Sequence, residues 1–141
     1  MSLTPPDLGK PYSTEADRAD AREALLLYWV AIESLIKLAK QPASQWSDQQ
    51  KSLFPSPSAQ GGPPEPPDRR LQRWLDIYSD EINLVRDVRS RLVHGGTLVT
   101  DPELRGAVYL ARHVVSSAMG VLPSQAEPVW ARNTLAQAAA S

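Results

Sequence analysis

The sequence predicts an all-α fold, an up-and-down bundle of four or five helices, and three observations lead to this prediction. Apolar residues recur at three- and four-residue steps over three long stretches, a spacing that places them on one face of a helix. Prolines, glycines and helix-capping residues bound those stretches. No stretch alternates apolar and polar residues over a useful length, so we expect no sheet.

The chain's 141 residues fit a single helical domain at 13–141, preceded by a proline-containing extended arm at 1–12. A formal net charge of −1 provides no overall field for nucleic acid or anionic lipid, so any RNA contact needs a local site. The chain has no cysteine, which excludes disulfides and thiol nucleophiles and fits a reducing compartment. The longest apolar run is too short to cross a bilayer, so we expect no membrane association. We also expect a cytoplasmic protein that uses no metal and no cofactor.

The first helix is expected to begin at Ser13 or Thr14, either of which can cap its free amides. Leu26, Leu27 and Val30 widen an already continuous apolar face, so the helix packs in the middle of the bundle or also contacts a second protomer. The face itself consists of Ala21, Leu25, Tyr28, Trp29, Ile32, Leu35, Ile36 and Ala39.

A proline-rich loop is predicted at 42–67, where seven of the thirteen prolines lie. A solvated connector is the plainer interpretation, and a docking ligand for a partner's aromatic groove is the alternative. Within the loop, residues 47–54 predict a short helix that Trp46 and Phe54 attach to the bundle.

Three further helices are predicted. One runs continuously from a cap at Asp68 to Gly95, and the next begins with Asp101 as its cap and Pro102 in its first turn. Pro123 stops that helix, and a weaker last helix covers 127–139.

Arg89 interrupts the apolar stripe of its helix, since it lies four residues after Val85 and three before Leu92. A guanidinium facing the interior needs an anion or a strong acceptor. Two explanations remain open: a site that binds phosphate, or an ion pair with a carboxylate, for which Glu33 is the natural candidate.

His94 is a second group of suitable chemistry at the end of the same helix. The glycines that follow allow the backbone to turn and expose the imidazole, and the negative helix terminus favours its protonated form. A histidine in this position can equally be an ordinary helix-end residue.

The segment from Leu84 to Gly95, Leu-Val-Arg-Asp-Val-Arg-Ser-Arg-Leu-Val-His-Gly, resembles the signature of HEPN domains. In that signature an arginine is followed after four to six residues by a histidine, and here four residues separate Arg89 from His94. The segment from Leu26 to Ile36 is similar to the helix that precedes the motif in the ApeA-like branch of the family. Together the matches cover the helical part from about residue 20 to 122.

The resemblance implies an all-helical homodimer with metal-independent endoribonuclease activity in its catalytic members, and often a role in bacterial defence or beside an antitoxin. Arg89 and His94 would be the catalytic pair. Ser90, Arg91, Asp87 and Glu33 would support them or bind RNA; for Arg91 and Asp87 a solvated helix face is the simpler interpretation. A non-catalytic HEPN module that binds RNA or a protein partner, and a generic helical scaffold with an accidental match, remain alternatives.

The residue types suit RNA cleavage on chemical grounds as well. Imidazole exchanges protons near neutral pH, and a guanidinium stabilises the developing charge on phosphorus. Positions five apart in a continuous helix point about 140° away from each other, so the two groups meet only if the helix end unwinds or a second protomer supplies one of them. We favour the second protomer.

Overall fold

The computed structural model describes residues 11–54, 65–95, 98–120 and 126–140, and every regular element in these ranges is a helix. The all-α prediction is therefore confirmed. In chain order the elements are α1 (Glu15–Ala39), the 3-10 turn η2 (Ala43–Gln45), α2 (Asp48–Ser52), α3 (Pro67–Ile77), α4 (Ser79–His94), α5 (Asp101–Ala118) and α6 (Ala126–Ala140).

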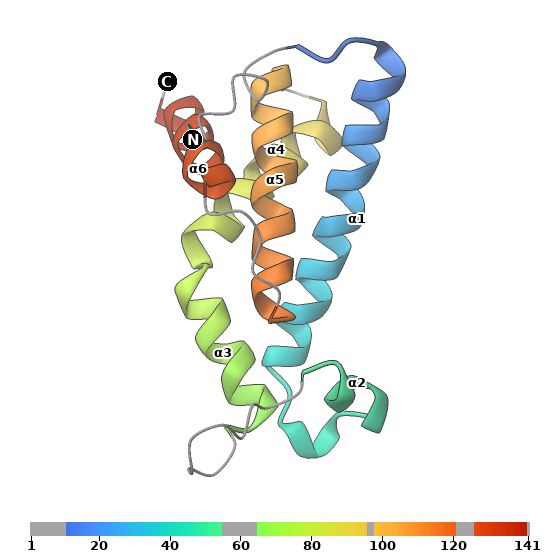
Figure 1. Cartoon of the computed structure of the whole chain (residues 1–141), viewed down its shortest axis with the longest axis vertical. Coiled ribbons are helices and arrows are strands. Elements are labelled where there is room, and N and C mark those ends of the chain that lie inside the picture. The colour runs from blue at the N-terminus through green and yellow to red at the C-terminus, as the bar shows by residue number, and fades with distance from the viewer. Residues whose placement is uncertain (1–10, 55–64, 96–97, 121–125, 141) are drawn as a thin grey trace.

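Helix α5 is the centre of the bundle, and it contacts α1, α3, α4 and α6. Figure 1 shows α1 alongside α5 and α6 beside the upper half of α5. Helix α2 lies beyond the C-terminal end of α1. The side chains facing α5 are apolar and lose essentially all contact with solvent, which supplies most of the stabilisation of the fold. The fully buried set includes Leu25, Ile32, Leu71, Ile82, Val85, Leu104, Leu110 and Val114.

Helix α1 begins as expected, with the Thr14 hydroxyl accepting the Asp17 N–H at 3.1 Å. The cap of α5 is Thr100, not the expected Asp101. Thr100 has Glu103 three residues later, so the two residues close a reciprocal capping box. Asp101 instead accepts the Tyr12 N–H at 2.9 Å and pairs with Arg18 at 3.1 Å.

The continuous helix expected from Asp68 to Gly95 is wrong, because the structure has two helices there that meet at Tyr78 (φ −105°, ψ 16°). Two contacts fix α3 on α5: the Trp74 indole donates to the Val114 carbonyl at 2.9 Å, and the Tyr78 ring packs edge-on against His113. The helix also begins at Pro67, so the Asp68 carboxylate is free to accept the Ala43 N–H at 3.1 Å.

The short helix expected in the proline-rich loop is confirmed as α2, with Ser47 as its cap. Trp46 and Phe54 are buried and pack edge to face, with ring centroids 5.8 Å apart. Residues 1–10 of the expected arm, 55–64 of the loop, Gly96 and Pro123 lie outside the described residues. Within the part of the chain that is described, no helix combines the length and apolarity needed to cross a membrane.

Candidate functional site

The C-terminal end of α4 carries His94 as its last residue, and the imidazole is exposed. Gly95 follows in the left-handed conformation (φ 66°) and donates its N–H to the Arg91 carbonyl at 3.0 Å. A side chain at this φ is strained, so glycine ends the helix here and leaves His94 at the negative end of the helix dipole. The expected position of His94 is confirmed.

Arg89 lies one and a half turns earlier and is half-buried. Its Nε atom is shielded from solvent and has no hydrogen-bond partner in the described part of the chain. Of the two explanations left open for Arg89, the ion pair with Glu33 is not formed, because Glu33 is exposed on α1. Ile32 occupies the core, and the next residue on a helix is turned by about 100° from it.

The contact between Arg86 and Trp29 shows which side of α4 faces α1. The Arg86 guanidinium carbon lies 5.5 Å from the centroid of the Trp29 ring. Arg89 and Val93 follow Arg86 by three and seven residues, so they lie on the same side of α4. Arg89 therefore stands along the line where α1 and α4 meet.

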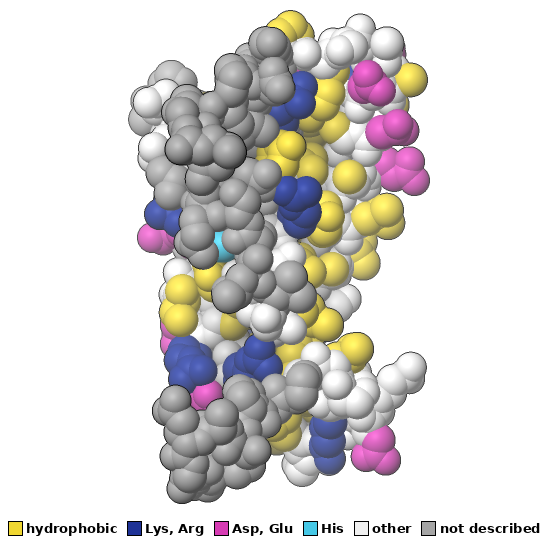
Figure 2. All heavy atoms as spheres, in the orientation of Figure 1, with side chains coloured by type: hydrophobic (Ala, Val, Ile, Leu, Met, Phe, Trp, Pro, Cys, Tyr) yellow, Lys and Arg dark blue, Asp and Glu magenta, His cyan; other side chains and the backbone are white. Residues whose placement is uncertain are grey.

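Three large apolar side chains that the single chain leaves exposed, here called the apolar strip, border this line: Leu26, Val30 and Val93. They are 39%, 59% and 51% exposed. On the face where α1 lies beside α5, Figure 2 also shows hydrophobic side chains at the surface along α1. A half-buried guanidinium whose Nε has no hydrogen-bond partner among the described residues thus stands next to an uncovered apolar surface.

Arg89 and His94 do not converge within one chain. Helix α4 keeps its helical geometry through His94, so the end does not unwind and the two side chains remain about 140° apart. Of the two arrangements considered from the sequence, the unwound helix end is therefore not observed.

Arg91 and Asp87 are engaged with each other and with α5. The Arg91 guanidinium pairs with Asp87 at 3.2 Å and hydrogen-bonds the Glu103 carboxylate. Burial alone would raise the pKa of Glu103, but hydrogen bonds from Arg91 and Thr100 outweigh it and hold that pKa below its usual value. Arg91 therefore holds two helices together, and Ser90 is half-buried.

Sequence reasoning missed two arginines at this end of the molecule. Arg18 and Arg22 of α1 line a shallow cleft of about 360 Å³ with Arg91, Leu92, Gly95, Leu98 and Val99. Arg22 is tied only to Glu15, in a pair whose side chains are 42% and 76% exposed, and such pairs exchange partners at little cost. In the sequence both arginines are ordinary polar residues of the first half of α1, and only the packing of α1 against α4 brings them beside the motif.

Among the described residues, no three histidine, aspartate or glutamate side chains lie close enough together to hold a metal ion. Comparison with family models, with curated proteins and with solved structures gives no match to this chain. The resemblance to HEPN domains therefore rests on the residues of the two matching segments, 26–36 and 84–95.

Proposed function

We propose that the protein is a cytoplasmic, metal-independent endoribonuclease of the HEPN type, active as a homodimer. In this proposal the RNA 2′-hydroxyl loses its proton and attacks the adjacent phosphorus, the bond from phosphorus to the 5′-oxygen breaks, and the leaving oxygen takes up a proton. The products carry a 2′,3′-cyclic phosphate and a 5′-hydroxyl. His94 exchanges protons with the reacting oxygens, and Arg89 stabilises the anionic phosphorus centre.

The observation that carries this proposal is the position of Arg89 beside the apolar strip. A cation that is half-buried without an anion is costly, and an exposed set of large apolar side chains is typical of an interaction surface. A two-fold dimer through the strip covers Leu26, Val30 and Val93 and sets the α4 helices of two chains side by side. In such a dimer, Arg89 of one chain can meet His94 of the other, although the two side chains of a single chain point about 140° apart.

Arg22 in the cleft supports a polyanionic substrate, because its pair with the exposed Glu15 is easily exchanged, whereas Arg18 is held by Asp101 and Arg91 by Asp87 and Glu103. The cleft lies beside the turn at Gly95, next to His94, where the flanking phosphates of a bound strand would need positive charge. A role in bacterial defence or with an antitoxin partner comes from the resemblance alone, and it is part of the proposal only in that sense.

The test is RNA cleavage by the purified protein in EDTA. The wild type should release fragments with cyclic phosphate ends, and His94→Ala and Arg89→Ala should each reduce the rate by about 10²-fold or more. Arg69→Gln, which removes an exposed charge from α3, is the matched control and should cleave like the wild type. RNA that is bound but left intact by a dimeric wild type would instead establish the non-catalytic binding module.

Mixing the two inactive variants tests whether the site is shared. When His94→Ala and Arg89→Ala chains are unfolded together and refolded, about half of the dimers are mixed, and each mixed dimer has one complete site of two. We expect about a quarter of the wild-type rate. A mixture as inactive as its parents would show that each site belongs to one chain, against the proposal.

A further inference from the structure

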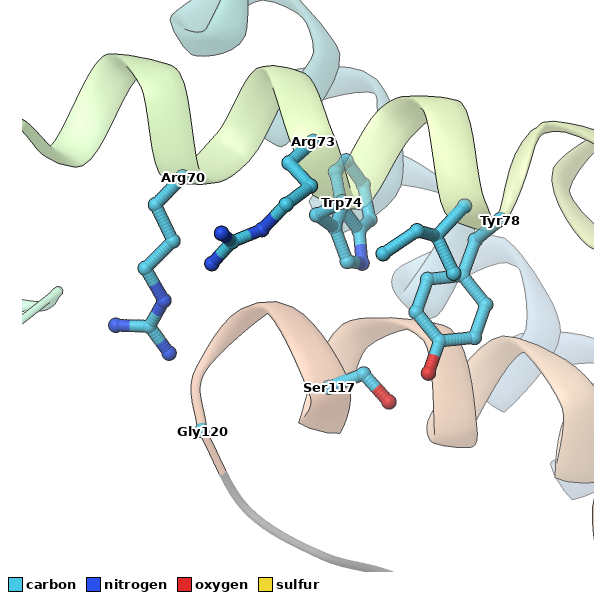
Figure 3. Close-up of a pocket in the computed structure, with 7 residues that line it drawn as sticks. Arg70, Arg73, Trp74, Tyr78, Ser117 and Gly120 are labelled. Atoms are coloured by element: carbon cyan, nitrogen blue, oxygen red, sulfur yellow. The ribbon is translucent and has the colours of Figure 1, made fainter. Parts of the chain in front are cut away.

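A second cavity lies at the opposite end of the bundle, between α3 and the end of α5, as Figure 3 shows. Its volume is about 240 Å³. Helix α4, which separates it from His94, has 16 residues and so is about 24 Å long. The cavity is therefore independent of the proposed nuclease site. It is lined by Arg70, Arg73, Trp74, Ile77, Tyr78, Ser117 and Gly120.

The break between α3 and α4 shapes this cavity. Arg70, Arg73 and Ile77 follow one another at three- and four-residue steps, so one side of α3 presents all three. In Figure 3 both arginine side chains extend from α3 toward the end of α5, and the Tyr78 and Ser117 hydroxyls lie in the same cavity. A continuous helix through Tyr78 would rotate the phenol ring to a different position.

Gly120 allows the Arg70 guanidinium to come close to the end of α5. The glycine has a positive φ of 82°, and a Cβ placed there would lie only 3.1 Å from Nη2 of Arg70. Because Gly120 has no side chain, the Arg70 guanidinium can lie directly against the backbone at this wall of the cavity. Two guanidinium groups, two hydroxyls and an apolar wall then face the same small volume.

The balance of charge decides what the cavity can bind. Arg73 pairs with Glu65 at 2.8 Å, and the two side chains are 62% and 36% exposed. The C-terminal end of α5 adds roughly half a negative charge. An incoming anion therefore has to compete with Glu65 for Arg73, and it meets the guanidinium of Arg70 in the same cavity. An anion stronger than a single carboxylate is needed to displace Glu65.

We propose that this cavity binds a small organic phosphate. The phosphate dianion accepts hydrogen bonds from Arg70, Arg73 and the Ser117 hydroxyl, while its apolar body lies on Ile77 and the Tyr78 ring. Guanidinium groups match phosphate geometry through paired N–H donors. Ligand cavities commonly measure about 300–1,000 Å³, so a cavity just below that range takes a small phosphomonoester.

The experiment is a titration with phenyl phosphate, inorganic phosphate and benzoate, followed by NMR at the Gly120 amide and the Trp74 indole N–H. Phenyl phosphate should shift both signals and bind more tightly than either of the other two. Arg70→Gln and Arg73→Gln should each weaken binding about tenfold. Arg69→Gln, the exposed neighbour with the same charge change, should weaken it less than twofold.

Glu65→Gln should strengthen phenyl phosphate binding, in contrast to the arginine variants, and is the most specific test. Removing the carboxylate that competes for Arg73 should tighten phenyl phosphate binding about fivefold. The proposal is overturned if Glu65→Gln leaves the affinity unchanged, if Arg69→Gln weakens binding as much as Arg73→Gln, or if benzoate binds best. The proposal is also overturned if phenyl phosphate shifts neither the Trp74 nor the Gly120 signal of a protein whose circular dichroism shows it to be folded.

Discussion

The guanidinium of Arg91 in α4 hydrogen-bonds the carboxylate of Glu103 in α5, and the two side chains are only 19% and 9% exposed. The same carboxylate accepts from the Thr100 N–H and hydroxyl in the capping box. The Glu103 side chain therefore caps the start of α5 and also anchors the end of α4 that carries His94. The geometry of the proposed nuclease site depends on this contact.

Replacing Glu103 with glutamine should destabilise the fold by about 2 kcal/mol at neutral pH, since it removes the negative charge from a shielded hydrogen bond to Arg91 and from the first turn of α5. Urea unfolding measures the change. Glu15→Gln is the control, because it removes an exposed first-turn carboxylate that pairs with Arg22, and it should cost about 0.5 kcal/mol or less. Equal losses in the two variants would contradict a special role for Glu103.

The Glu103 contact also predicts how stability depends on acid. Its pKa in the folded protein lies below the ordinary value of 4.5, so its contribution is complete above that pH and is lost as pH falls through the folded pKa. Unfolding free energy of the wild type should thus fall more steeply below pH 4.5 than that of Glu103→Gln. Parallel acid curves for the two proteins would refute this assignment.

His113 should titrate below its ordinary value of 6.5. Burial lowers its pKa, the nearby Arg132 lowers it further, and Glu81 opposes them. Because the folded pKa is depressed, stability is complete above pH 6.5 and decreases as pH falls through the folded pKa. NMR titration of the ring should show a midpoint below 6.5 that rises in Arg132→Gln. A midpoint that does not move in this variant would exclude Arg132 as a cause.

Replacing each of two glycines with alanine should change the stability of the fold in opposite directions. Gly95→Ala forces a side chain into the left-handed region and should cost about 1 kcal/mol. Gly106 lies inside α5, where an added Cβ would meet α6 atoms at an ordinary 3.6 Å, so Gly106→Ala should stabilise by up to about 1 kcal/mol. Thermal unfolding of both variants tests this, and destabilisation by Gly106→Ala would reveal tighter packing against Ala131 than the distance indicates.

Val30→Asp should break the proposed dimer without unfolding the chain. Val30 is 59% exposed in the single chain, so its replacement leaves the core intact, whereas a charge inside an apolar interface opposes association. Sedimentation should show monomers at concentrations where the wild type is dimeric, and RNA cleavage should fall with the dimer. Leu53→Asp, at a comparably exposed leucine beside α2, is the control and should remain dimeric.

Local chemistry explains what could be predicted from the sequence. Caps, prolines and apolar spacing act over a few residues, so Thr14, the short helix after Ser47 and the helix end at His94 and Gly95 were all accessible without coordinates. The outward position of His94 follows from the same local rules. Where two local solutions compete, as at Thr100 and Asp101, the reciprocal bond to Glu103 decides between them.

Packing between distant segments decided the rest, because contacts far apart in sequence leave no periodic trace. The break at Tyr78 contains neither proline nor glycine and depends on contacts of Trp74 and Tyr78 with α5. The same packing turned Glu33 away from Arg89 and exposed the apolar strip beside it. The sequence by itself determined the helices and the chemical groups they carry, whereas the tertiary structure decided which groups have partners, since only packing sets their distances.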